Sequence, residues 1–185
     1  MTDDHTGPEE LTPAVDLTLR AAVLELEKHA AASGWDQAAQ LYALVPAGDV
    51  VGADPQAAEI VGLPADVDPA TLVTIEQGDL PPDLSLEQLL DQIEWPEEVR
   101  GTAVVVERLV LPPSVGEVPE DLEEAARFAQ GHPEREEVRI VAGALRGGST
   151  YAAMRLRSRD DDFAVLESPD LVPSLLELLQ KTLGS

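Results

Sequence analysis

Apolar residues recur at spacings of three and four along several stretches of the chain, which is the periodicity of an amphipathic helix. The clearest stretch predicts a helix over residues 13–32, with Thr12 as its N-cap and Gly34 just past its end. Ser85 and Gln88 have the spacing of a capping box at the start of another helix. The same pattern predicts helices near residues 55–61, 86–93, 120–130 and 171–183.

Shorter runs of aliphatic and β-branched residues predict strands. They lie at residues 40–45, 71–76, 102–111, 137–146 and 150–158, and residues 163–166 are a candidate for one short strand more. Because strands and helices do not alternate regularly, the order favours an α+β fold. We expect a mostly antiparallel sheet of about five strands with helices on one side, opened by the N-terminal helix and closed by the C-terminal one.

The length of 185 residues suits a single domain. Residues 1–10 are acidic and contain no apolar run, so we expect a disordered leader there and one α+β domain over residues 11–185. The Pro-rich segments 46–70 and 111–119 are interpreted as loops of that domain. With neither a secretory signal nor an apolar stretch of membrane-spanning length, the sequence predicts a cytoplasmic protein.

The pattern of residues 137–158 tests the register of the hairpin that they are expected to form. With a two-residue loop, the residue numbers of each cross-strand pair sum to 295. Ile140 then lies opposite Arg155, which mixes charge into the apolar face. A three-residue loop over 147–149 pairs positions that sum to 296 and separates the two kinds of side chain. One face then holds Val138, Ile140, Ala142 and Ala144 with Ala152, Met154 and Leu156.

The other face of this hairpin carries Tyr151 and three arginines, with Arg139 directly opposite Arg157 and Arg155 two residues along. Like charges opposed on a sheet are destabilising, so a negative group is expected beside them. One hypothesis assigns that role to carboxylates of this chain: Glu137, residues 160–162 or the acidic N-terminal half. The other assigns it to a bound anion or to an acidic segment of a protein partner.

Charge is high and uneven. The chain contains 36 acidic and 12 basic residues, a net charge of −24, of which residues 1–99 contribute −19. Nucleic-acid binding and attraction to anionic lipid both need an excess of Lys and Arg, so neither is expected. The segregation of charge indicates either an interaction surface or two halves of the chain that neutralise one another.

Catalytic and metal-binding patterns are few. The chain has no cysteine, its three histidines are widely separated, and residues 160–162 lack the spacing of a calcium loop, so no metal or cofactor is predicted. His132, with Glu134, Glu136 and Glu137 close in sequence, is the one candidate for a general base; its alternative role is to close the helix before it. Trp95 adjoins an element boundary, where it closes a core edge or anchors an interface.

Several short motifs occur together: Glu94-Trp-Pro-Glu-Glu98, Arg100-Gly101, Glu107-Arg108, Leu111-Pro-Pro113, Gly131-His-Pro133, Arg139 and Ala142-Gly-Ala-Leu-Arg-Gly147. With them the chain resembles, over nearly its full length, an uncharacterised family of acidic actinobacterial proteins. This resemblance implies a bacterial protein of unknown function, with no catalytic residue to transfer. In element order alone, the chain is similar to type III secretion chaperones, which are dimeric and bind other proteins.

The leading hypothesis is therefore a non-catalytic, chaperone- or adaptor-like protein-interaction module that forms a homodimer, with Arg139, Arg155, Arg157, Tyr151 and Trp95 as candidate contacts. A sensor of anionic small molecules that uses the same arginines is the first alternative. A hydrolase that uses His132 with a nearby Glu is the second.

Overall fold

The computed structural model describes residues 15–81, 83–117, 119 and 121–184. Six strands form one sheet: β1 (Gln40–Pro46), β2 (Leu72–Glu76), β3 (Gly101–Val110), β4 (Glu136–Leu145), β5 (Thr150–Leu156) and β6 (Leu166–Ser168). The α-helices are α1 (Leu17–Ser33), α2 (Ala47–Ala53), α3 (Pro55–Ile60), α4 (Leu86–Leu90), α5 (Leu122–Gly131) and α6 (Pro173–Thr182). Single 3₁₀ turns occur at Pro113–Val115 (η1), Arg157–Arg159 (η2) and Asp162–Ala164 (η3).

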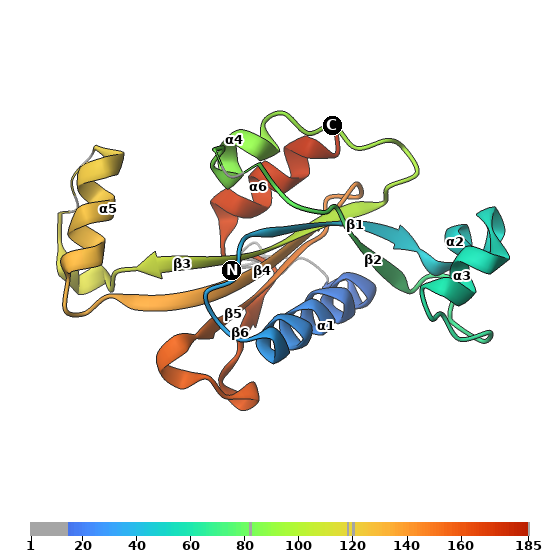
Figure 1. The fold of residues 1–185 in the computed structure, drawn as a ribbon, viewed down its shortest axis with the longest axis horizontal. Coiled ribbons are helices and arrows are strands. Elements are labelled where there is room, and N and C mark those ends of the chain that lie inside the picture. The colour runs from blue at the N-terminus through green and yellow to red at the C-terminus, as the bar shows by residue number, and fades with distance from the viewer. Residues whose placement is uncertain (1–14, 82, 118, 120, 185) are drawn as a thin grey trace, which may run out of the picture.

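The sheet is antiparallel throughout, in the order β2-β1-β3-β4-β5-β6. The α+β class is thus confirmed, but the sheet has six strands where about five were expected. The sixth is β6, which begins at Leu166, so the candidate strand at residues 163–166 was placed too early. Figure 1 shows α5 at the far end of the long β3–β4 pair and α2 and α3 beyond the opposite side of the sheet.

The helices cover both faces of the sheet, so the expectation of helices on one side was wrong. Helix α1 packs on one face, and α4 and α6 pack on the other (Figure 1). The run Ala103–Val106 explains the difference, since its odd residues are buried under α1 and its even residues under α4 and α6. A strand that is apolar at successive positions is buried on both faces, and this run has that pattern.

Helix α1 begins at Leu17 rather than at residue 13. Asp16 is its N-cap, because its carboxylate accepts hydrogen bonds from the N–H groups of Thr18 and Leu19 at 3.0 and 3.1 Å. The predicted cap at Thr12 and the predicted leader over residues 1–10 lie outside the described residues. The predicted apolar stripe is otherwise confirmed, with Leu19, Ala22, Val23, Leu26 and Ala30 all buried.

The β4–β5 hairpin has the predicted faces in a different register. Its pairs sum to 294, so Arg139 lies opposite Arg155 and not opposite Arg157. The loop does have three residues, but they are 146–148, and Gly148 supplies the positive φ of 88°. A slip of two residues returns every side chain to the same face, which is why the apolar pattern could not distinguish 294 from 296.

Candidate functional site

The three predicted arginines do gather at one end of the sheet, on the face that α1 covers. We call Arg139, Arg155 and Arg157 the arginine cluster. Arg139 and Arg155 are 1% and 2% exposed, whereas Arg157 lies past the end of β5, in the turn η2, and is more open to solvent. Two guanidinium groups are therefore part of the protein interior, where a charge needs a partner.

Arg155 is held by three carboxylates of this chain. Glu27 of α1 makes a bidentate pair with it, at 2.6 Å to Nε and 3.0 Å to Nη2. Asp160 and Asp162, from the loop between β5 and β6, reach the same guanidinium at 3.2 and 2.8 Å. The hydrogen bonds to Glu27 raise the pKa of Arg155 above its ordinary value. This arginine therefore ties α1 and the loop to the sheet.

Arg157 is paired just outside the core. Asp36 binds it with both carboxylate oxygens, at 2.9 and 3.0 Å, and Glu137 of β4 accepts a further bond from its Nη1. The guanidinium lowers the pKa of Asp36 below its ordinary value. Asp36 has a positive φ of 66°, a conformation that Asp tolerates better than most residues.

Trp35 covers the cluster from the loop that follows α1. Its ring lies 4.3 Å from the guanidinium carbon of Arg139 and 5.5 Å from that of Arg157, which are cation–π distances. The indole N–H donates to Asp160 at 2.9 Å and is the main cause of the lowered pKa of that carboxyl. Arg139 itself pairs with Glu107 at 3.0 Å and donates to the carbonyl of Gly34.

The hypothesis that carboxylates of this chain neutralise the arginines agrees with these contacts. Glu27 and Asp36 come from the acidic first half of the sequence, and the arginines come from the second half. The two halves therefore neutralise one another at this end of the sheet. Each arginine of the cluster has at least one carboxylate partner, so an incoming anion would compete with existing bonds at Arg155 and Arg157. Arg139 differs, because its buried Nε and Nη1 have no hydrogen-bond partner among the described residues.

Tyr151 lies on the same face of β5, four residues before Arg155. It is buried, and its hydroxyl donates to Glu167 at 2.9 Å and accepts from Arg20 at 3.1 Å. Burial raises the pKa of Tyr151, and the Arg20 guanidinium lowers that of Glu167. Tyr151 thus belongs to a second polar group, which joins α1 to β6.

Trp95 is not near the arginines. Its ring packs among the residues that α4 and α6 bury on the opposite face, and its indole N–H donates to Thr182 at 3.1 Å. The guanidinium of Arg146, which was not among the predicted site residues, binds the carbonyls of Trp95 and Pro96 at 2.8 Å each. These bonds hold the Trp95 segment against the end of α6, so Trp95 closes the edge of the core.

His132 directly follows helix α5. Its Nδ1 accepts the N–H of Glu134 at 3.2 Å, and its ring lies 5.5 Å from that of Phe128. Both contacts are local to the turn after the helix. No ion pair of the imidazole is found among the residues that the structure describes.

An apolar surface that the sequence pattern did not predict lies beside the arginine cluster. Phe163 is 99% exposed, in the turn η3, and Leu166 is 50% exposed in β6. Phe163 and the half-buried Leu24 of α1 and Val165 form what we call the edge patch, whereas Leu166 pairs with Met154 and points to the opposite face of the sheet. A pocket of about 470 Å³ lies within it, lined also by Glu27, Lys28, Arg155, Asp162 and Glu167. The only signal in the sequence was a lone aromatic residue directly after three aspartates.

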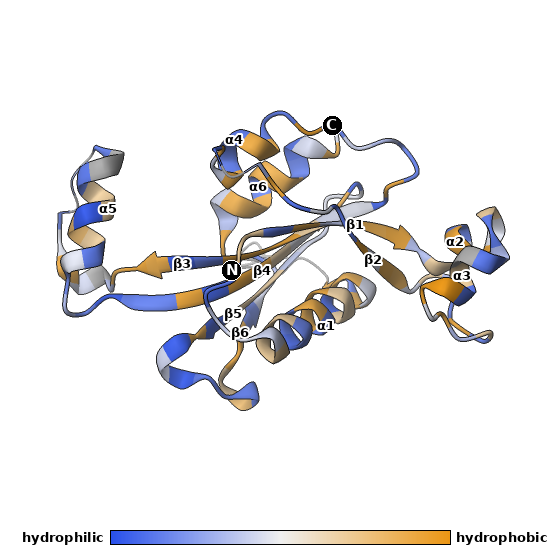
Figure 2. Ribbon diagram, viewed as in Figure 1, coloured by the Kyte–Doolittle hydropathy of each residue, from blue (hydrophilic) through white to orange (hydrophobic). Residues whose placement is uncertain are grey.

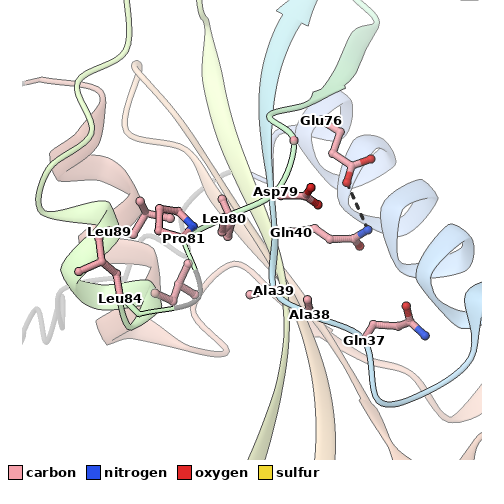
Figure 3. Close-up of a pocket in the computed structure, with 12 residues that line it drawn as sticks. Gln37, Ala38, Ala39, Gln40, Glu76, Asp79, Leu80, Pro81, Leu84 and Leu89 are labelled. Carbon is pink, nitrogen blue, oxygen red and sulfur yellow. Dashed lines mark hydrogen bonds between the residues drawn. The ribbon is translucent and has the colours of Figure 1, made fainter.

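A second pocket, of about 340 Å³, opens between the segment before β1 and helix α4. Figure 3 shows Leu80, Pro81, Leu84 and Leu89 on one side of it, with Asp79 and Glu76 on the other. The Gln40 amide donates to Glu76 at 3.5 Å (Figure 3). The lining of this pocket contains carboxylates and amides but no basic residue. None of the predicted site residues lines it.

Within the described part of the chain, no three His, Asp or Glu side chains are grouped so that they could hold a metal ion. In the same residues, no helix has the length and apolar character needed to cross a membrane. The pockets and the arginine cluster are therefore the features on which a functional argument can be based.

Comparison with known proteins adds one finding. The family described as PPA1309-like protein matches residues 19–184, which is most of the chain. No curated protein and no solved structure matches it. The predicted resemblance to an uncharacterised family is confirmed, and the likeness to secretion chaperones stays a prediction.

Proposed function

The chain belongs to the PPA1309-like protein family, and we propose that it is a non-catalytic, adaptor-like module that binds protein through the edge patch. The observation that carries this proposal is Phe163, an aromatic side chain that is 99% exposed yet lies in an ordered turn. The proposal keeps the sequence-based expectation of an actinobacterial, cytoplasmic protein.

The turn that presents Phe163 is attached to the protein interior through the residues that precede Phe163. Asp160 and Asp162 bind the buried Arg155, and the Asp161 carboxylate accepts the N–H of Phe163 at 2.8 Å. Figure 2 shows the loop between β5 and β6 as a largely hydrophilic segment. An anchor held in place before binding loses little entropy when it binds, which increases affinity.

The arginine cluster has a supporting role in this proposal. Arg155 positions the loop of Phe163, and Arg157 and Arg139 hold the Trp35 segment beside it. Because these arginines already bind carboxylates of the chain, the contact with a partner is assigned to the apolar side chains. Aromatic residues at the centre of a patch contribute much of the binding energy in protein interfaces.

The test is affinity purification of the tagged chain from its native host, with mass spectrometry of the recovered proteins. Phe163→Ser removes the anchor, and we expect it to weaken binding by about 1.5–3 kcal/mol, the value of burying one large apolar side chain. Ile60→Ser is the matched control, because Ile60 is 85% exposed but lies in α3.

A protein that is recovered by wild type and by Ile60→Ser, and lost with Phe163→Ser, would support the edge patch as the contact. Recovery that is equal in all three baits would refute this surface. Circular dichroism of both variants checks that the fold is retained, which we expect because both side chains are exposed.

A further inference from the structure

The surroundings of the edge patch are acidic. The segment over residues 160–170, which supplies two of the three apolar side chains of the patch, contains five acidic residues and no lysine or arginine. Two of the five, Asp161 and Asp170, form no ion pair among the residues that the structure describes. An apolar centre is thus combined with an excess of negative charge.

The carboxylates that do have a cation partner are only partly neutralised. Glu27, Asp160 and Asp162 share the single guanidinium of Arg155, so one positive charge faces three negative ones. The side chain of Asp162 is 77% exposed, and it lines the pocket of the edge patch. This pocket therefore presents a carboxylate to whatever binds against the apolar side chains.

Lys28 carries the opposite charge on the other side of the same pocket. It belongs to α1, whereas Asp161 and Asp162 belong to the loop between β5 and β6. Like Asp161, Lys28 forms no ion pair within the described part of the chain. The pocket thus has a basic helix side and an acidic loop side, which gives a bound segment a preferred direction.

Charge complementarity decides which segment fits this arrangement, because opposite charges across an interface speed association and disfavour wrong partners. We propose that the protein segment bound at the edge patch carries a lysine or arginine next to its apolar anchor. The anchor packs against Phe163. The cation pairs with the carboxylates of Asp161 and Asp162, away from Lys28. This differs from the acidic partner segment expected at the arginines, because Arg155 is already paired within the chain.

This inference rests on the proposed function, because it names the chemistry of the partner at the same patch. Its first test is selection from a random dodecapeptide phage library on the immobilised chain, after depletion on the Phe163→Ser variant. Depletion removes peptides that bind only through the net charge of −24, because the variant keeps every charged residue. In the peptides that remain, we expect lysine or arginine beside an apolar residue more often than in the unselected library, and aspartate or glutamate less often.

The second test measures one selected peptide against three charge variants by fluorescence anisotropy. Asp161→Asn removes a carboxylate but can still cap the N–H of Phe163, and it should weaken binding about two- to fivefold, the value of an exposed ion pair. Lys28→Gln should strengthen binding, because it removes a like charge. Glu59→Gln is the matched control, because it changes the net charge equally but lies in α3, away from β6 (Figure 1). Added salt should weaken binding to the unmodified chain more than to Asp161→Asn.

The outcomes separate this inference from the proposed function. Phe163-dependent peptides without the enrichment in basic residues would overturn the inference and leave the proposed function standing. Equal affinities with Asp161→Asn and Glu59→Gln, or weaker binding with Lys28→Gln, would overturn it as well. A selection that yields no Phe163-dependent peptide would contradict the proposed function, and the inference with it.

Discussion

Replacing Glu27 by Gln should destabilise this protein far more than neutralising an exposed carboxylate of the arginine cluster such as Asp36. The Glu27 and Arg155 side chains are 5% and 3% exposed, and two hydrogen bonds of 2.6 and 3.0 Å join them. Gln retains the shape of the side chain and its helix propensity but removes the charge. The buried guanidinium then keeps only Asp160 and Asp162, whose side chains are largely exposed to solvent.

Removing one partner of a buried pair typically costs 3–5 kcal/mol, and the two remaining aspartates place the expected loss at the lower end, about 3 kcal/mol. For a domain of this size that corresponds to a fall in Tm of about 6–12 °C. Asp36→Asn is the matched control, because it neutralises the exposed partner of Arg157 and should cost far less than Glu27→Gln.

The assay is urea unfolding followed by far-ultraviolet circular dichroism and tryptophan fluorescence. The double variant Glu27→Leu/Arg155→Met removes both charges and should recover most of the loss, since a buried pair replaced by apolar side chains is often neutral. Equal costs for Glu27→Gln and Asp36→Asn would refute the reasoning, because burial would then have no effect on the pair. No recovery in the double variant would show that the pair contributes net stability.

Three further predictions concern packing, capping and pH. Gly101→Ala should destabilise the fold by about 1–3 kcal/mol, because its Cβ would lie 2.4 Å from a buried leucine methyl and 2.5 Å from a backbone oxygen. Gly52→Ala is the control, because Gly52 lies within a helix with open space around it, and it should stabilise the fold by up to about 1 kcal/mol. The Tm values of the two variants test this difference. Ser85→Ala should cost about 1 kcal/mol in urea unfolding, and Ser85→Asp, which can still cap, should cost less. Folding lowers the pKa of Asp160 and of Glu167 below their ordinary values of 3.8 and 4.5, which stabilises the folded protein. This stabilisation is fully present at a pH above the ordinary pKa values. It is lost as the pH falls through the lowered pKa values of the folded protein. Stability measured from pH 7 to pH 2 should therefore decline below about pH 4, and a decline confined to higher pH would contradict this assignment.

Much of the local structure followed from the sequence. The capping box of Ser85 and Gln88 is present, with the serine hydroxyl 3.2 Å from the N–H of Gln88 and the Gln88 side chain 2.9 Å from the N–H of Ser85. The apolar stripe of α1 is buried where its spacing indicated. Such features depend on residues three or four positions apart, so the chain encodes them without reference to the rest of the fold.

The candidate site was predictable only in part. Three arginines and a tyrosine on one hairpin face were visible from alternation along the strands. The need for a negative neighbour was also visible, because like charges would otherwise oppose one another. The nearby neighbours Glu137, Asp160 and Asp162 were also predicted, because they are close to the arginines in the sequence. Glu27 was not, since it is 128 residues from Arg155 and no local pattern distinguishes it from 35 other acidic residues.

The amino-acid sequence by itself determined which side chains share a face, because the pleat of a strand repeats every two residues and the turn of a helix every 3.6. The tertiary structure alone decided the register of the β4–β5 hairpin, in which the residue numbers of each pair sum to 294. A slip by two residues leaves every side chain on the same face, so only the loop and the neighbouring strands distinguish the alternative registers. It also decided that Phe163 lies exposed beside an open edge, because exposure depends on where distant segments pack.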